Sequence, residues 1–132
     1  MKRSTTVHQK PWGTEEIWAS THHSIGKILI INPLQRLSRK YHRIKNHTIR
    51  IMEGVLFLEV GPLAPGGGIE TITLRPGEAY YLSAQTIHRF CAGDERVKLL
   101  EISNGGPSDS VRLEDDYRRI TKIPTPGPQS EK

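Results

Sequence analysis

The chain has 132 residues, one cysteine and a formal net charge of +5, with 19 lysines and arginines against 14 acidic residues. This length fits one domain with its own core, and a single cysteine excludes an intrachain disulfide and a cysteine-based zinc knuckle. No apolar run approaches the roughly 20 residues of a membrane-spanning helix. Residues 1–8 are basic without an apolar segment behind them, unlike a secretory signal, so we expect a cytoplasmic protein.

The basic residues concentrate between residues 36 and 50, with little aromatic interleaving. Proteins that bind nucleic acids commonly combine a basic surface with aromatic side chains that stack on the bases. A basic cluster beside a buried site suits a phosphorylated or carboxylated small molecule at least as well. We therefore expect a small-molecule substrate and no membrane partner, with nucleic acid as the less favoured alternative.

Short strands are expected along most of the chain, after a flexible arm formed by residues 1–9. Apolar and β-branched segments recur at about 8–12-residue spacing, which is typical of an antiparallel sandwich or barrel. The expected strands are residues 14–19, 27–32, 48–52, 55–60, 69–74, 79–82, 86–92 and 97–103. Glu53 and Gly54, between two of these strands, indicate a hairpin. Arg75-Pro76-Gly77-Glu78 indicates a turn, because proline presets φ and glycine permits positive φ.

Only the C-terminal part departs from this pattern. Residues 108–119 can hold a short helix or turn. The proline-rich residues 124–132 cannot pack, and we expect them to be a disordered tail. The sequence thus predicts an all-β fold, with a single domain over residues 10–123 and a short helical or turn segment near its end.

Three histidines lie in the strand-rich part of the chain, at His42, His47 and His88. In an extended strand, residues two apart point to the same side, so Ile44 would share an interior face with His42. His47 follows a turn and can return to that face. Three neutral imidazoles inside a barrel can hold a divalent metal with open positions. The alternative is that these are partly buried histidines satisfied by hydrogen bonds.

Several motifs, spread from about residue 10 to residue 119, occur together in one known family. They are Lys10-Pro11-Trp12-Gly13, Arg36-Leu37-Ser38, Gly54, Arg75-Pro76-Gly77-Glu78, His88-Arg89 and Val111-Arg112-Leu113-Glu114-Asp115-Asp116-Tyr117. The chain resembles the cupin domain of type II mannose-6-phosphate isomerases, which in bacteria is often fused behind a mannose-1-phosphate guanylyltransferase. The resemblance implies a double-stranded β-helix barrel, dimeric, with a divalent metal (Zn, Fe, Mn, Co or Ni) inside.

The same resemblance implies interconversion of an aldose phosphate and a ketose phosphate, with a proton moving between C1 and C2 through an enediol. The site departs from the family motif, because Ile44, His47 and Thr48 stand where the family has His, Glu and His. His42, His47 and His88 remain as the implied metal ligands. His47 and Glu101 are the candidates for the proton-transferring base.

Five further residues are candidates for substrate contacts. Arg36, Lys45 and Arg89 would bind phosphate or carboxylate if they line the mouth of the barrel, since arginine suits bidentate contacts with oxyanions. Arg112 and Tyr117 belong to the C-terminal motif, and the resemblance carries them over as substrate contacts or as residues that close the barrel.

Two other functions stay open because a fold does not fix a function. One is a non-catalytic cupin that binds a sugar or small anion. The other is a cupin recruited to different metal-dependent chemistry, such as oxygenation or cyclisation in secondary metabolism.

Overall fold

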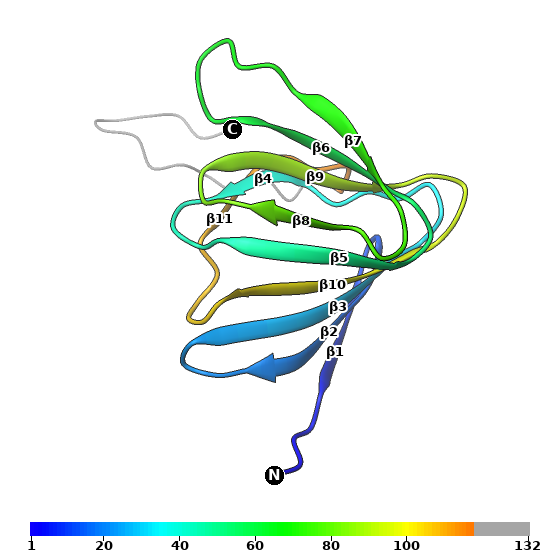
Figure 1. Cartoon of the computed structure of the whole chain (residues 1–132), viewed down its shortest axis with the longest axis vertical. Helices are drawn as coiled ribbons and strands as arrows, with labels where there is room; N and C mark the ends of the chain where they lie inside the picture. Colours follow the sequence, from blue (N-terminus) through cyan, green and yellow to red (C-terminus); the bar gives the residue numbers. More distant parts are fainter. Residues whose placement is uncertain (118–132) are drawn as a thin grey trace.

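In the computed structural model, which describes residues 1–117, the chain forms two antiparallel β-sheets (Figure 1). The six-stranded sheet contains, in spatial order, β1 (Thr6–Lys10), β2 (Gly13–Ser20), β3 (Ser24–Ile31), β10 (Val97–Asn104), β5 (His47–Glu53) and β8 (Ala79–Leu82). The five-stranded sheet contains β11 (Ser110–Glu114), β4 (Arg39–His42), β9 (Thr86–Ala92), β6 (Leu56–Pro62) and β7 (Glu70–Leu74). Residues 1–117 contain no helix that is long and apolar enough to cross a membrane.

Alternating burial along the strands creates the core between the sheets. In β5, Ile49 and Ile51 are buried while Arg50 is exposed, the period-two pattern of a strand with one face covered. The core draws on both sheets. It contains Trp12, Leu29, Ile31, Leu37, Ile49, Ile51, Leu56, Leu58, Val60, Leu74, Leu82, Phe90, Val97 and Leu99. The predicted all-β fold is confirmed.

The expected hairpin at Glu53 and Gly54 is wrong. Strand β5 pairs with β10 and β8, whereas β6 pairs with β7 and β9, so this turn carries the chain from one sheet to the other. Gly54 adopts a φ of 76° and lies against the backbone of Arg96, where an added Cβ would stand 2.2 Å from the carbonyl oxygen. Local turn residues identified the reversal, but the pairing of the strands depends on contacts far apart in sequence.

Both ends of the described chain hold strands that the sequence pattern did not reveal. Residues 6–10, within the segment expected to be a flexible arm, pair with β2. Residues 110–114 form β11 rather than a helix, because Val111 is buried and pairs with Tyr41 of β4, and a turn follows at residues 116 and 117. The expected tail, residues 124–132, lies outside the described residues. The expected turn at Arg75–Glu78 is confirmed by a hydrogen bond of 3.0 Å from Glu78 N to Arg75 O.

The outer face of the six-stranded sheet carries apolar side chains flanked by charges. One row of cross-strand partners runs over four strands and holds, in order, Glu16, Ile28, Leu100 and Arg50. Ile102 lies beside this row on the same face of β10 and is 45% exposed. The row therefore starts with an acid, ends with a base and has two apolar side chains between them.

Candidate active site

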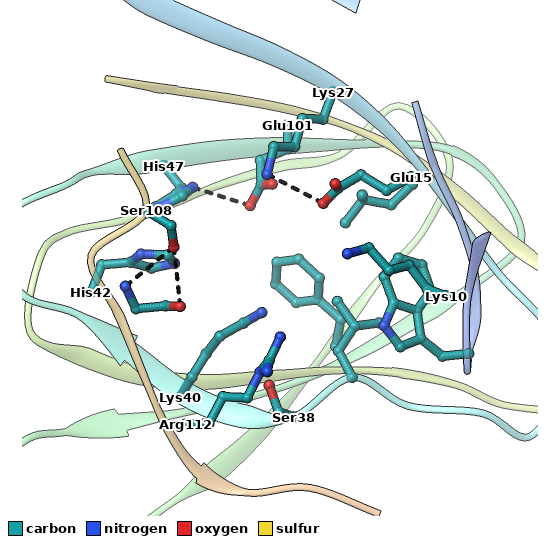
Figure 2. A pocket seen from close by; sticks show the side chains of 15 residues that line it. Lys10, Glu15, Lys27, Ser38, Lys40, His42, His47, Glu101, Ser108 and Arg112 are labelled. Carbon is teal, nitrogen blue, oxygen red and sulfur yellow. Dashed lines mark hydrogen bonds and ion pairs between the residues drawn. The ribbon is translucent and has the colours of Figure 1, made fainter. Parts of the chain in front are cut away.

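A cavity of about 310 Å³ lies between the two sheets (Figure 2). Every second residue of β4 faces it, beginning with Ser38 just before the strand and continuing with Lys40 and His42. The complete lining is Lys10, Trp12, Glu15, Lys27, Leu29, Leu37, Ser38, Lys40, His42, His47, Phe90, Glu101, Ser108, Ser110 and Arg112. Charged and polar side chains thus meet inside a largely apolar barrel.

One end of the cavity is cationic. Lys40 and Arg112 are direct cross-strand partners on β4 and β11, so two positive side chains lie next to each other and face the cavity. Figure 2 shows Lys10, Lys40 and Arg112 pointing towards the same open space. Burial lowers the pKa of Lys40 to about 8, although Glu101 acts in the opposite direction. Lys27, another cation of the cavity lining, makes an ion pair with Glu15 at 3.2 Å.

The other end of the cavity holds His47 and Glu101, which are neighbours on β5 and β10. His47 Nδ1 lies 3.1 Å from Glu101 Oε2, but the N–H direction does not match a hydrogen bond, and within residues 1–117 both buried ring nitrogens of His47 lack a hydrogen-bond partner. Burial acts to raise the pKa of Glu101, yet His47 and the two nearby lysines outweigh it and hold the pKa at about 2. Glu101 is therefore ionised at neutral pH.

His42 is fixed by a carboxylate outside the cavity lining. Its Nδ1 lies 2.9 Å from Asp109 Oδ1, and the second oxygen of Asp109 accepts hydrogen bonds from the backbone N–H groups of Ile44 (2.7 Å) and Lys45 (2.8 Å). Burial acts to raise the pKa of Asp109, but these hydrogen bonds prevail and hold it at about 2. Burial, with His47 nearby, lowers the pKa of His42 to about 4, so this imidazole is neutral at pH 7.

The three predicted metal ligands come together, but not in the arrangement of a metal site. Their ring centroids are separated by 4.0 Å for His42 and His47, 5.5 Å for His42 and His88, and 6.4 Å for His47 and His88. His88 is buried beside Phe90, outside the cavity lining, and its Nδ1 lies 3.0 Å from Thr86 O. Among the described residues, no three His, Cys, Asp or Glu side chains form a group suited to hold a metal. The donors as placed do not fit a divalent cation.

The positions at which the family motif has further histidines point away from the cavity. Ile44, expected to share the interior face with His42, is 79% exposed in the loop after β4. Thr48 is exposed on the outer side of β5, because its neighbour His47 faces inwards. The expectation for Ile44 is wrong, since β4 ends at His42 and the strand alternation ends with it.

Three predicted substrate contacts lie away from the cavity. Arg36 makes a bidentate ion pair with Asp116, at 2.8 and 2.9 Å. Arg89 follows His88 on β9 and so points to the opposite face of the sheet, where its Nε donates to a backbone carbonyl (2.9 Å). The hydroxyl of Tyr117 donates to the side chain of Gln35. These residues hold the segment after β11 against the barrel.

Apart from His88, the other predicted site residues do reach the cavity or its margin. His42, His47, Glu101 and Arg112 line the main cavity. Lys45 lines a smaller adjoining cavity of about 120 Å³ that also touches His42 and His47, and its Nζ donates to Gly106 O at 2.7 Å. Its ammonium group is thus already partnered.

Sequence reasoning missed three residues that define the site, Lys10, Lys40 and Asp109. Lys10 was identified only as part of a family motif, and neither Lys40 nor Asp109 was among the candidate site residues. The alternation of Ser38, Lys40 and His42 was a usable signal, because a strand that turns His42 inwards also turns Lys40 inwards. No local signal connects Asp109 with His42, since 67 residues separate them.

No protein-family model matches the sequence, and no curated protein is similar to it. The structure is similar to the capsular polysaccharide assembling protein CapF from Staphylococcus aureus, with a TM-score of 0.75 and 14% identity over 86% of this chain and 35% of that chain. It also resembles KdgF from Halomonas sp., with a TM-score of 0.65 and 15% identity over 80% of this chain and 90% of that one.

A third similar structure is an uncharacterised conserved protein with a double-stranded β-helix domain from Klebsiella pneumoniae, with a TM-score of 0.63 and 16% identity over 75% of this chain and 77% of that one. This chain spans about a third of the length of CapF. At these identities the likeness establishes the fold alone. The chain has the double-stranded β-helix fold of cupins, as predicted.

Proposed function

We propose that the cavity binds a small phosphorylated sugar and catalyses its aldose–ketose isomerisation, with His47 moving a proton between C1 and C2. The observation that carries this proposal is the direct pairing of Lys40 and Arg112 inside the cavity, opposite the His47–Glu101 end. Like charges that face each other across two strands destabilise a sheet unless something offsets their repulsion. An anion bound between them would lower this repulsion.

The size and charge of the cavity suit one sugar phosphate. Its volume of about 310 Å³ is at the lower end of the range for small-molecule sites. Lys10, Lys40 and Arg112 provide positive charge for a phosphate, and guanidinium and ammonium groups are the usual partners of phosphate oxygens. Trp12 and Phe90 supply apolar surface beside them, against which a sugar ring or chain can pack.

Proton transfer is assigned to His47 because of its surroundings. Its side chain lines the cavity, and its buried ring nitrogens have no hydrogen-bond partner within the described residues, so a bound substrate would not have to displace an existing hydrogen bond. Glu101, ionised at neutral pH, stabilises the imidazolium that forms when His47 takes a proton. A C–H proton next to a carbonyl becomes acidic enough for such a base when the developing oxyanion is stabilised.

Two further lines support the proposal. The motifs that resemble those of type II mannose-6-phosphate isomerases are spread from about residue 10 to residue 119, and Arg112 belongs to one of them, whereas His47 stands where the family has Glu. One similar structure is a capsular polysaccharide assembling protein, which places this fold in a protein concerned with carbohydrate.

The deciding experiment follows hydrogen exchange at the substrate carbons. Mannose 6-phosphate or fructose 6-phosphate is incubated with the protein in D₂O, and deuterium at C1 and C2 is monitored by NMR. We expect incorporation with the native protein and at least a 100-fold slower rate with His47→Gln, within the range for loss of a general base. His22→Gln, in an exposed loop, is the matched control and should exchange at the native rate.

A second candidate function rests on the cationic end alone. Lys10, Lys40 and Arg112 would also hold a small anion in a protein that carries out no reaction. Binding of mannose 6-phosphate by calorimetry, without any exchange in D₂O for either sugar phosphate, would favour this non-catalytic binder and contradict the isomerase.

A further inference from the structure

Asp109 is the best-anchored carboxylate near the cavity, although it does not line it. Its Oδ2 accepts two backbone hydrogen bonds, from Ile44 N at 2.7 Å and Lys45 N at 2.8 Å. Its Oδ1 lies 2.9 Å from His42 Nδ1. The loop before β11 is thereby attached to the loop after β4, and the carboxylate has a single orientation with one oxygen directed at the imidazole.

This contact decides the tautomer of His42. An ionised carboxylate accepts hydrogen bonds and cannot donate one, so the Nδ1 of His42 must carry the proton. In a neutral imidazole the other nitrogen, Nε2, is then an acceptor with a free lone pair. Since Asp109 occupies the Nδ1 edge of the ring and His42 lines the cavity, Nε2 is the nitrogen left for a ligand.

His42 stands next to the proposed base. The rings of His42 and His47 are 4.0 Å apart between centroids, so a ligand atom reached by one lies within a few ångströms of the other. Both histidines have a carboxylate behind them, Asp109 for His42 and Glu101 for His47. The cavity therefore presents two imidazoles side by side, and a hydrogen bond to Asp109 positions that of His42.

We propose that His42 is a second proton-transferring residue, which carries the hydroxyl proton between the two substrate oxygens, and that Asp109 is its positioning residue. This inference rests on the proposed function, because an aldose–ketose conversion requires one proton to move between carbons and another between oxygens. It names the residue for the second transfer.

The two transfers balance without an added reactant. His47 takes the C2 proton, the electron pair of that bond forms the C1–C2 double bond, and the carbonyl electrons become a lone pair on O1. His42 Nε2 accepts the proton of O2 and delivers it to O1, which leaves O2 as the new carbonyl oxygen. The imidazolium of His47 returns its proton to C1, and both histidines end neutral as they began.

The first measurement is the tautomer of His42, from two-bond ¹H–¹⁵N correlation spectra of protein labelled with ¹⁵N-histidine. We expect His42 in the Nδ1–H form in the native protein. In Asp109→Asn the side-chain amide still accepts from Ile44 N and Lys45 N, but its amide group can donate to Nδ1, so we expect a shift to the Nε2–H form. An Nε2–H form in the native protein would overturn the inference.

The second measurement compares binding with turnover. Asp109→Asn should lower kcat for sugar phosphate isomerisation about 100-fold and change the Kd for mannose 6-phosphate less than twofold, because the cationic end is intact. Asp116→Asn, which removes a carboxylate paired with Arg36 away from the cavity, is the matched control and should retain native kcat. Native kcat in Asp109→Asn would also overturn the inference.

The result separates this inference from the proposed function. If the native protein isomerises no sugar phosphate, the proposed function fails and the role of His42 in it fails as well. The positioning role of Asp109 is then still decided by the tautomer spectra. If isomerisation occurs but Asp109→Asn leaves both the tautomer and kcat unchanged, the proposed function stands and the inference about His42 and Asp109 is wrong.

Discussion

The charge of Lys40 provides the sharpest test of the proposed anion site. Lys40→Gln removes one positive charge from the cavity and keeps a side chain of similar length with a polar end. The opposing Arg112 and the neighbouring Lys10 stay in place. We expect the substitution to weaken the binding of mannose 6-phosphate while the barrel stays folded.

The expected magnitude follows from the environment of the ammonium group. Two unit charges about 4 Å apart interact by about 4 kcal/mol at an effective dielectric constant of ~20, and desolvation offsets part of this gain. A hydrogen bond to a charged group contributes about 1.5–3 kcal/mol net. At about 1.4 kcal/mol per tenfold, Lys40→Gln should raise the Kd by about 10- to 150-fold.

The pH dependence gives an independent check on the same residue. Because burial lowers the pKa of Lys40 to about 8, the unliganded protein loses this positive charge as the pH rises from 7 to 9. A sugar phosphate keeps its charge over this range, since its second pKa is about 6. Binding should therefore weaken as the pH passes through about 8 in the native protein, and this dependence should be smaller in Lys40→Gln.

Calorimetric titrations at pH 7, 8 and 9 measure both effects. Lys98→Gln is the matched control, because Lys98 alternates with buried residues on β10 and points to the outer face of the barrel. It should leave the Kd within twofold. If Lys40→Gln binds mannose 6-phosphate as tightly as the native protein at pH 7, Lys40 does not contact the anion and the cationic end is not the binding site.

Four other expectations can be checked separately. The free energy of unfolding should fall between pH 7 and pH 5. His42 and His88 stay neutral in the folded protein, with pKa values of about 4 and 3, but take up protons near pH 6.5 in the unfolded chain. Equal stability in urea titrations at both pH values would contradict this prediction. Gly54→Ala should destabilise the protein by about 2 kcal/mol or more, and by more than Gly66→Ala, because Gly66 has a similar φ of 73° but nothing within 4 Å of an added Cβ. Elemental analysis of the purified protein should find well below one metal ion per chain, since the histidine side chains are not arranged to hold a cation. About one ion per chain that disappears in His42→Ala would overturn that interpretation. We also propose a homodimer through the outer face of the six-stranded sheet, where a twofold axis would set Glu16 of one copy against Arg50 of the other. Light scattering should then show a dimer that the substitution Leu100→Glu converts to a monomer. A monomeric native protein would refute this proposal.

The sequence by itself predicted the strands best where apolar alternation was strong. Residues 79–82 and 86–92 form strands with the expected bounds, and the strand at residues 97–103 extends by one residue. The prediction of strands was weaker where the strands are short or polar, as in Arg39–His42, whose residues are charged or aromatic. Such a strand forms because its neighbours β9 and β11 pair with it, and a local pattern does not contain this information.

The chemistry of the site divides in the same way. The resemblance to the isomerase family, rather than the residue types alone, indicated His42, His47, Glu101 and Arg112 as site residues. The alternation of side chains along a strand decides which arginines reach the cavity. Arg89 points away from it, because the preceding residue, His88, points inwards.

Only the tertiary structure brought the defining groups together. Lys40 meets Arg112 because β4 and β11, 72 positions apart in the chain at this pair, are neighbours in the five-stranded sheet. His42 meets Asp109 through the same pairing. The sequence determined which functional groups are available, and the pairing of strands distant in sequence determined which of them share a cavity, because sheet register is set by the packing of the whole barrel.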